Sequence, residues 1–174
     1  MEDGLQVSKN YFISMVKIWK ILNKPKYKNI SQCLKDLKKN QIILSYWIID
    51  IIRNKKNKIK ITNTKVKLYR IKVRNLGFKK PTTLKSIYKK INKLDFRLVP
   101  IDIALRARLV YKNQKKGEWL RIATEMKSMV DSDNVPHLPK LGKALNKFFI
   151  ETYWAYPEAI FHPHNEFVVC KYDF

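Results

Sequence analysis

The sequence predicts a mainly α-helical domain that carries one β-hairpin and ends in a short strand. Three observations indicate this fold class. Apolar residues recur at helical spacing in the first 55 residues and again between residues 118 and 154. Residues 84–103 have the pattern of two extended segments around the sequence INKLD. The last ten residues, NEFVVCKYDF, have the composition of a short strand.

Apolar spacing in the first 55 residues predicts three helices. Residues 10–22 form the first, and Pro25 prevents its easy continuation. Residues 30–39, ISQCLKDLKK, form the second, with an apolar face opposite a lysine face. Residues 42–53 contain the most apolar run of the chain, which Asp50 interrupts and which is too short to span a bilayer. We therefore expect a buried helix there.

The segment after the third predicted helix is ambiguous, and the last third is clearer. Residues 65–74 alternate basic and apolar side chains, which favours a strand, although the same residues fit a helix. Residues 118–130 and 141–154 each place apolar side chains on one helical stripe, and a loop with two prolines separates them. On this pattern Trp119 and Trp154 are interpreted as core anchors, and an RNA-recognition sheet is disfavoured because FFIETYW follows a helical pattern.

The charge of the chain is large and unevenly distributed. The 174 residues hold 37 Lys and Arg against 14 acids, a net charge of +23, while 45% of residues are hydrophobic. Such a composition predicts one folded basic domain. Residues 16–94 hold 24 basic residues and two acids, whereas residues 117–174 hold six basic residues and eight acids. This division indicates a surface for a polyanion, with nucleic acid favoured over an anionic membrane and over a merely solvated basic face.

Residues that could support catalysis or bind a metal are sparse. The four glycines are too scattered for a phosphate-binding loop, and HExxH and CxxC are absent. Cys33 and Cys170 lie far apart, which is typical of a reduced protein. His137, His162 and His164 could join Cys170 at zinc, but their spacing matches no compact finger. We expect no metal, no cofactor and no enzymatic activity.

Six segments, read in order, carry a family resemblance. They are PKYKNISQCLKDLKKNQ, IILSYWIIDII, VRNLGFKKP, VPIDI, LRIATEM and KALNKFFIETYW, and they span roughly residues 25–156. In order and spacing they resemble the small-subunit ribosomal protein seven family. The chain departs from that family at the hairpin tip, which lacks paired glycines, in the shortened segment 106–117, and at both termini, residues 1–24 and 157–174.

The resemblance implies a single RNA-binding domain over residues 1–174, a helical bundle with a protruding β-hairpin and a short C-terminal strand-like tail. It implies a structural constituent of the small ribosomal subunit that binds rRNA of the head domain. Its neighbours would be other small-subunit proteins, exit-site tRNA and mRNA. Lys, Ile and Asn make up 63 residues, which favours an AT-rich, organelle-encoded gene and a place in the mitochondrial matrix. The alternatives are another organellar ribosomal protein and a DNA-binding replication or regulatory protein of an AT-rich plasmid or virus.

Basic residues of the helices, the connector and the hairpin are expected to meet RNA phosphates. They are Lys26, Lys28, Lys35, Lys38, Lys39, Lys55, Lys56, Lys58, Lys60, Lys79, Lys80, Lys89, Lys90, Lys93, Arg97, Arg106, Arg108 and Lys112. Arg106 and Arg108 are placed at the base of the hairpin, where a guanidinium can hold a phosphate or stack on a base. The alternative is that one of them pairs with Asp102 or Glu118 inside the fold.

Overall fold

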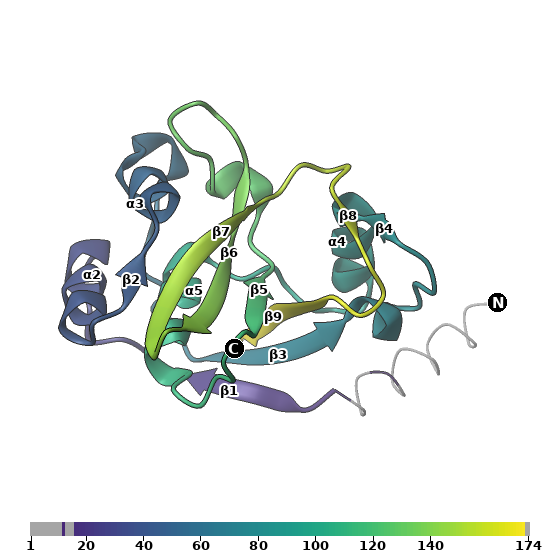
Figure 1. Ribbon diagram of the computed structural model, residues 1–174, viewed down its shortest axis with the longest axis horizontal. Helices are drawn as coiled ribbons and strands as arrows, with labels where there is room; N and C mark the ends of the chain where they lie inside the picture. The colour runs from purple at the N-terminus through teal and green to yellow at the C-terminus, as the bar shows by residue number, and fades with distance from the viewer. Residues whose placement is uncertain (1–11, 13–15, 173–174) are drawn as a thin grey trace.

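A seven-stranded mixed sheet forms the centre of the computed structural model, which describes residue 12 and residues 16–172 (Figure 1). In spatial order its strands are β1 (Ile18–Leu22), β3 (Val66–Lys72), β9 (Glu166–Tyr172), β5 (Trp119–Ile122), β6 (His137–Ala144), β7 (Lys147–Trp154) and β2 (Ile43–Leu44). The pairs β9–β5 and β7–β2 are parallel, and the others are antiparallel. With 31% helix and 30% strand, the mainly α-helical prediction is wrong.

Helices cover both faces of the sheet. They are α2 (Ile30–Lys39), α3 (Tyr46–Arg53), α4 (Leu84–Lys93) and α5 (Ile101–Val110). Along β9, Val168 and Cys170 join the core cluster that contains α2, α3 and α5. Phe167 and Val169 join the cluster that contains α4. Because neighbouring strand residues point to opposite faces, α4 lies on one face of the sheet and α2, α3 and α5 lie on the other.

Short elements complete the fold. Three 3₁₀ turns are η1 (Lys55–Asn57), η2 (Val73–Leu76) and η3 (Met126–Ser128), and a small second sheet pairs β4 (Thr82–Thr83) with β8 (Ile160–Phe161). In Figure 1, α4, β4 and β8 lie at one end of the molecule, and α2 and α3 lie at the other. The two ends therefore present separate surfaces.

Several predicted elements are confirmed. Helix α2 has the predicted bounds and begins after Asn29, whose side chain accepts a hydrogen bond from the Gln32 amide at 3.1 Å. The apolar run at 42–53 contains α3, but Ser45 caps that helix and the residues before it form β2. The ambiguous segment 65–74 contains β3, and the predicted C-terminal strand is β9.

The predicted β-hairpin over residues 84–103 is wrong, since the chain there forms α4 and the start of α5. Leu84, Ile87, Tyr88 and Ile91 are buried at the spacing of one helical face, and Thr83 caps the helix. In α5 every residue from 101 to 108 is buried. Its lack of a polar face disguised the helix, because a helix buried on all sides has no amphipathic period.

The helices predicted over residues 118–130 and 141–154 are also wrong. The first range forms β5 and η3, and the second lies in the β6–β7 hairpin, which runs in register from His137↔Trp154 to Ala144↔Lys147. Leu145 and Asn146 both have positive φ, 47° and 58°, as a type I′ turn requires. Of the helix predicted over 10–22, residues 18–22 form β1, and most of the remainder lies outside the described residues.

Candidate nucleic-acid interface

Helix α2 presents lysines to solvent and is joined to the segment that precedes it. Cys33 and Leu37 are buried on its inner face, while three lysines on the outer face are exposed. The Tyr27 hydroxyl donates to Oδ2 of Asp36 at 2.6 Å. Burial, with this hydrogen bond, raises the pKa of Tyr27. The segment 24–28 is thereby held along the helix, and it adds exposed lysines to the same surface: Lys24, Lys26 and Lys28.

The basic connector between α3 and β3 lies beside segment 24–28. Ile61 and Asn63 of the connector line a cavity of about 420 Å³ together with Lys24, Lys26 and Lys28. Farther back along the connector, Lys55, Lys56, Lys58 and Lys60 are exposed. Segment 24–28 is therefore adjacent both to α2 and to the end of the connector. The exposed lysines of these three segments are here called the lysine-rich side: Lys24, Lys26, Lys28, Lys35, Lys38, Lys39, Lys55, Lys56, Lys58 and Lys60.

Arg106 anchors both loops of the lysine-rich side from within the core. Its guanidinium donates to the carbonyl oxygen of Asn23 and, at 3.4 Å, to that of Thr62. Its partner Asp102 accepts hydrogen bonds from the Thr62 amide and hydroxyl, each at 2.8 Å. Helix α5 therefore holds the two lysine-bearing loops together, and Arg106 itself is only 6% exposed.

Arg108 is still more deeply buried, at 1% exposure. It donates to the Gln114 side chain and to the Tyr111 carbonyl, and its guanidinium lies 4.4 Å from the Phe148 ring centroid. Burial lowers the pKa of Arg108 to about 10. The predicted RNA contact by Arg106 and Arg108 is therefore wrong. The alternative of an internal pair with Asp102 is what the structure shows for Arg106.

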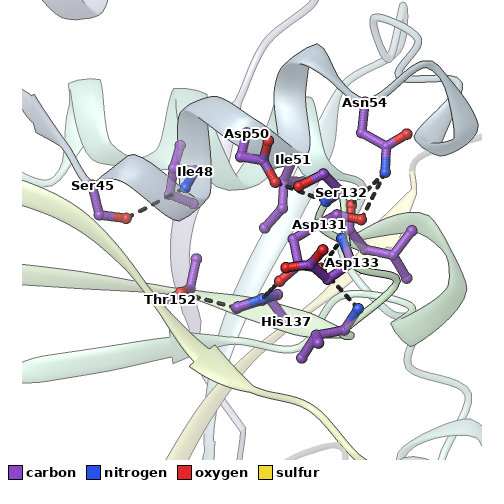
Figure 2. A network of polar contacts seen from close by, with 12 residues as sticks. Ser45, Ile48, Asp50, Ile51, Asn54, Asp131, Ser132, Asp133, His137 and Thr152 are labelled. Carbon is purple, nitrogen blue, oxygen red and sulfur yellow. Dashed lines mark hydrogen bonds and ion pairs between the residues drawn. The ribbon is translucent and has the colours of Figure 1, made fainter.

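A buried polar network fixes the loop that the connector packs against (Figure 2). Nε2 of His137 lies 2.9 Å from Oδ2 of Asp131, and Nδ1 lies 3.1 Å from the Thr152 hydroxyl. Asn54, at the end of α3, donates to the backbone oxygens of Asp131 at 2.9 Å and Val130 at 3.2 Å. The network thus joins the β6–β7 hairpin to the start of the basic connector.

Thr152, His137 and Asp131 have the residue types of a catalytic triad, but a substrate could not reach His137 or Asp131. The imidazole of His137 is fully buried, and the indole of Trp47 stacks on it at 5.5 Å. Asp131 also accepts the amides of Asp133 and Val135, so its carboxylate is occupied within its own loop. Hydrogen bonds from His137 and these amides outweigh burial and hold the pKa of Asp131 below its usual value. We therefore interpret the network as structural.

The residues weighed as zinc ligands do not converge. His162 and His164 stack on each other in an exposed loop, with ring centroids 5.6 Å apart. Cys170 is buried in β9, where its thiol lies 3.4 Å from the Leu98 carbonyl, and His137 belongs to the network above. Across residues 12 and 16–172, no three His, Cys, Asp or Glu side chains are grouped to hold a metal ion.

The remaining predicted positions lie on elements other than those of the lysine-rich side. The positions predicted on a hairpin, Lys89, Lys90 and Lys93, belong to α4, at the end of the molecule opposite α2 (Figure 1). Lys79 and Lys80 are exposed just before β4. Arg97, also exposed, pairs its backbone with Cys170, and Lys112 is exposed directly after α5. The predicted positions are therefore spread over several elements, and those of α4 lie at the other end of the molecule from α2.

Sequence reasoning missed one group of exposed side chains. Trp119 and Trp154 were predicted as core anchors, but they are 39% and 65% exposed. The exposure of Trp119 follows from the strand alternation of β5, because its neighbour Leu120 takes the buried position.

A groove of about 640 Å³ lies between α2, β2 and α3. Its walls are aliphatic, with three cations at the rim. Its lining residues are Leu34, Lys38, Gln41, Ile42, Ile43, Leu44, Ile49, Ile52, Arg53 and Lys147. None of these described residues is an acid, a histidine or a cysteine, and none carries a hydroxyl group. The groove therefore offers no acid–base or nucleophilic pair of the kind that catalysis uses.

No protein-family model, curated protein or solved structure matches this chain. Within the part of the chain that the structure describes, no helix combines the length and apolarity needed to cross a membrane.

Proposed function

We propose that the protein is a non-catalytic RNA-binding protein whose lysine-rich side contacts the phosphate backbone of folded RNA. One observation carries the proposal: three adjacent segments, α2, residues 24–28 and the connector, all carry exposed lysines, and Arg106 anchors the last two from within the core. Asp36 and Asp50 are the two acids among residues 16–94. Asp36 binds Tyr27, and Asp50 accepts the Ser132 amide at 2.7 Å. The segments that carry these lysines therefore contain little acidic charge of their own.

Lysine is suited to sequence-independent contact with phosphate. Its ammonium is a compact point charge on a flexible stem, so it follows a phosphate backbone without the fixed geometry of a base contact. Each neutralised phosphate releases counterions, so the logarithm of the binding constant should fall linearly with the logarithm of salt concentration, with a slope of about −0.7 to −0.9 per contact. A surface of this kind recognises the shape of a folded RNA.

We further propose that the RNA is the rRNA of the small subunit of a mitochondrial ribosome. Its support is the six-segment resemblance and the abundance of Lys, Ile and Asn. The seven-stranded sheet differs from the helical bundle with a hairpin that the resemblance implied. The position near the tRNA exit site therefore loses its structural basis and is not part of the proposal.

Two matched charge-reversal variants of the full chain test the RNA-binding proposal. Both replace three exposed lysines by glutamate, one set on the lysine-rich side and one on α4: K26E/K35E/K38E and K85E/K89E/K93E. Filter binding to a structured RNA over a salt series should show a weaker affinity and a shallower slope for the first variant, with a smaller change for the second. Equal losses, or wild-type preference for duplex DNA, would contradict the proposal.

The ribosomal assignment is tested separately. A tagged full-length chain expressed in mitochondria should co-sediment with the small subunit on a sucrose gradient and remain after a salt wash, while K26E/K35E/K38E should move to the top fractions. If the wild-type chain stays at the top but binds structured RNA in vitro, the RNA-binding proposal stands and the ribosomal one fails.

A further inference from the structure

One face of the strands β5, β6 and β7 carries several aromatic and basic side chains that solvent reaches. Leu120, Leu141 and Ile150 point to the opposite face and pack in the cluster with α5. On the α4 face, that helix packs with β3 and β9 through Tyr69 and Phe167. On this face Leu138 is buried in the cluster with α4. Six further side chains of β5–β7 on the same face are at least partly exposed: Trp119, Arg121, Lys140, Phe149, Glu151 and Tyr153.

Strand register arranges these side chains in rows. Trp119 lies opposite Gly142, which lies opposite Phe149. Two residues further along the strands, Arg121, Lys140 and Glu151 form the next row in the same way. Tyr153 follows on β7. Since a strand rises about 3.3 Å per residue, successive rows lie roughly 7 Å apart. A cationic row therefore lies between two aromatic positions.

Gly142 gives Trp119 its place on the sheet. A Cβ at residue 142 would meet the Trp119 ring at 2.2 Å, so the indole lies directly against the Gly142 backbone. The Phe149 ring is next to it, with centroids 6.5 Å apart and planes tilted by 47°. The indole is 39% exposed, and Tyr153 is 38% exposed. Both rings combine a fixed position with access from solvent.

The cations of this face lie over the aromatic rings. Nζ of Lys140 is 4.8 Å from the Trp119 ring, and the guanidinium of Arg121 is 5.2 Å from that of Tyr153 and 5.6 Å from that of Phe161. Arg121 has a buried Nε without a hydrogen-bond partner in the described structure. Two cations against the single carboxylate of Glu151 make the face positive. An anion with flat rings complements it.

We infer that this aromatic–cationic face, formed by Trp119, Arg121, Lys140, Phe149 and Tyr153, stacks unpaired bases of the bound RNA. Aromatic side chains on a strand accept bases of any identity, and the cations between them meet the backbone. The inference deepens the proposed function and rests on it. The aromatic–cationic face lies on the α4 side of the sheet, whereas α2, with its lysines, packs on the other side. The preferred ligand therefore has a folded region for the lysine-rich side and a single-stranded segment for the aromatic–cationic face.

The test compares two RNA probes: a hairpin with a single-stranded tail, and the same hairpin without the tail. Wild-type full-length protein should bind the tailed hairpin more tightly. Trp119→Leu and Tyr153→Leu should each remove roughly tenfold or more of that advantage, the loss expected for one base stack. Binding of the untailed hairpin should not change. Trp119→Phe and Tyr153→Phe keep a ring and should keep most of the advantage.

Trp154 provides the matched control. It is the next residue along β7, so it points to the opposite face, and it is 65% exposed. Trp154→Leu should leave the tail advantage unchanged. The tail should also quench tryptophan emission in the wild type and in Trp154→Phe, and this quenching should shrink in Trp119→Phe while affinity persists.

The outcomes separate the inference from the proposed function. If neither probe binds, the RNA-binding proposal itself fails. If both probes bind equally to the wild type, or if Trp119→Leu and Tyr153→Leu keep the full tail advantage, the stacking inference is overturned. Equal weakening of both probes, or as large a loss in the Phe variants as in the Leu variants, would assign these rings a role in the fold and would also overturn it.

Discussion

Nη1 of Arg106 lies 3.5 Å from Oδ2 of Asp102, one turn earlier in α5, and both side chains are buried. The pair also reaches outward: Arg106 binds the Asn23 carbonyl and Asp102 binds Thr62. This pair therefore links the helix in the core with the two loops that carry lysines to the surface.

Removing one partner of this pair should destabilise the fold. Arg106→Ala leaves the Asp102 carboxylate buried beside Thr62, and such an uncompensated charge costs about 3–5 kcal/mol. Guanidinium denaturation followed by circular dichroism should show the loss as a lower midpoint with an unchanged slope. Lys39→Ala on the exposed face of α2 is the control and should stay within about 0.5 kcal/mol of the wild type. A stable Arg106→Ala protein that binds RNA poorly would restore the surface role for this arginine.

Arg106, Arg108 and the exposed tryptophans Trp119 and Trp154 are residues whose exposure could not be predicted from the sequence. The lysine-rich side could be predicted, because lysine is almost never fully buried. Arg106 and Trp119 have exposures opposite to those expected from residue type. Tertiary structure decides both: α5 is enclosed on all sides, and Trp119 lies on the face of β5 opposite to the buried Leu120.

Some secondary-structure elements could likewise be predicted from the sequence, and others could not. Helix α2 could be predicted because its cap and its apolar face lie within ten residues. The helix expected over 141–154 became a hairpin because its residues pair with each other and with neighbouring strands, and short-range apolar periodicity does not report strand pairing. Helix α4 carried a helical spacing in its buried residues, so this element was open to prediction.

Gly142→Ala should disturb Trp119. The added methyl group would occupy the space of the indole, so the ring must move off the sheet. We expect a loss of about 1–3 kcal/mol, the usual cost of overpacking, and a red shift of the tryptophan emission as the ring becomes more solvated. In the background of Trp119→Leu, which leaves more room, the same substitution should cost less. Equal costs in both backgrounds would contradict direct contact between Gly142 and the indole.

The Asp131–His137 contact predicts an acid sensitivity. The pKa of Asp131 is lower in the folded protein than its usual value, because His137 and two amides bind the ionised form. Its contribution to stability is therefore present above about pH 4 and is lost as the pH falls through the folded pKa. Asp131→Asn should lower the unfolding free energy by about 1–3 kcal/mol at neutral pH. The difference from the wild type should shrink at acidic pH in urea denaturation, and a constant difference would contradict the assignment.

The two cysteine thiols should be protected from alkylation in the folded protein. Cys33 lies on the inner face of α2 and Cys170 on β9, and burial raises the pKa of each to about 12. Because the thiolate is the reactive form, little of either residue is reactive at neutral pH. Iodoacetamide labelling followed by mass spectrometry should show slow modification of both in buffer and fast modification in guanidinium. Lys35→Cys places a third thiol on the exposed face of the same helix and should react at the rate of an ordinary free thiol. Fast labelling of Cys33 in buffer would mean that α2 does not pack on the core as described.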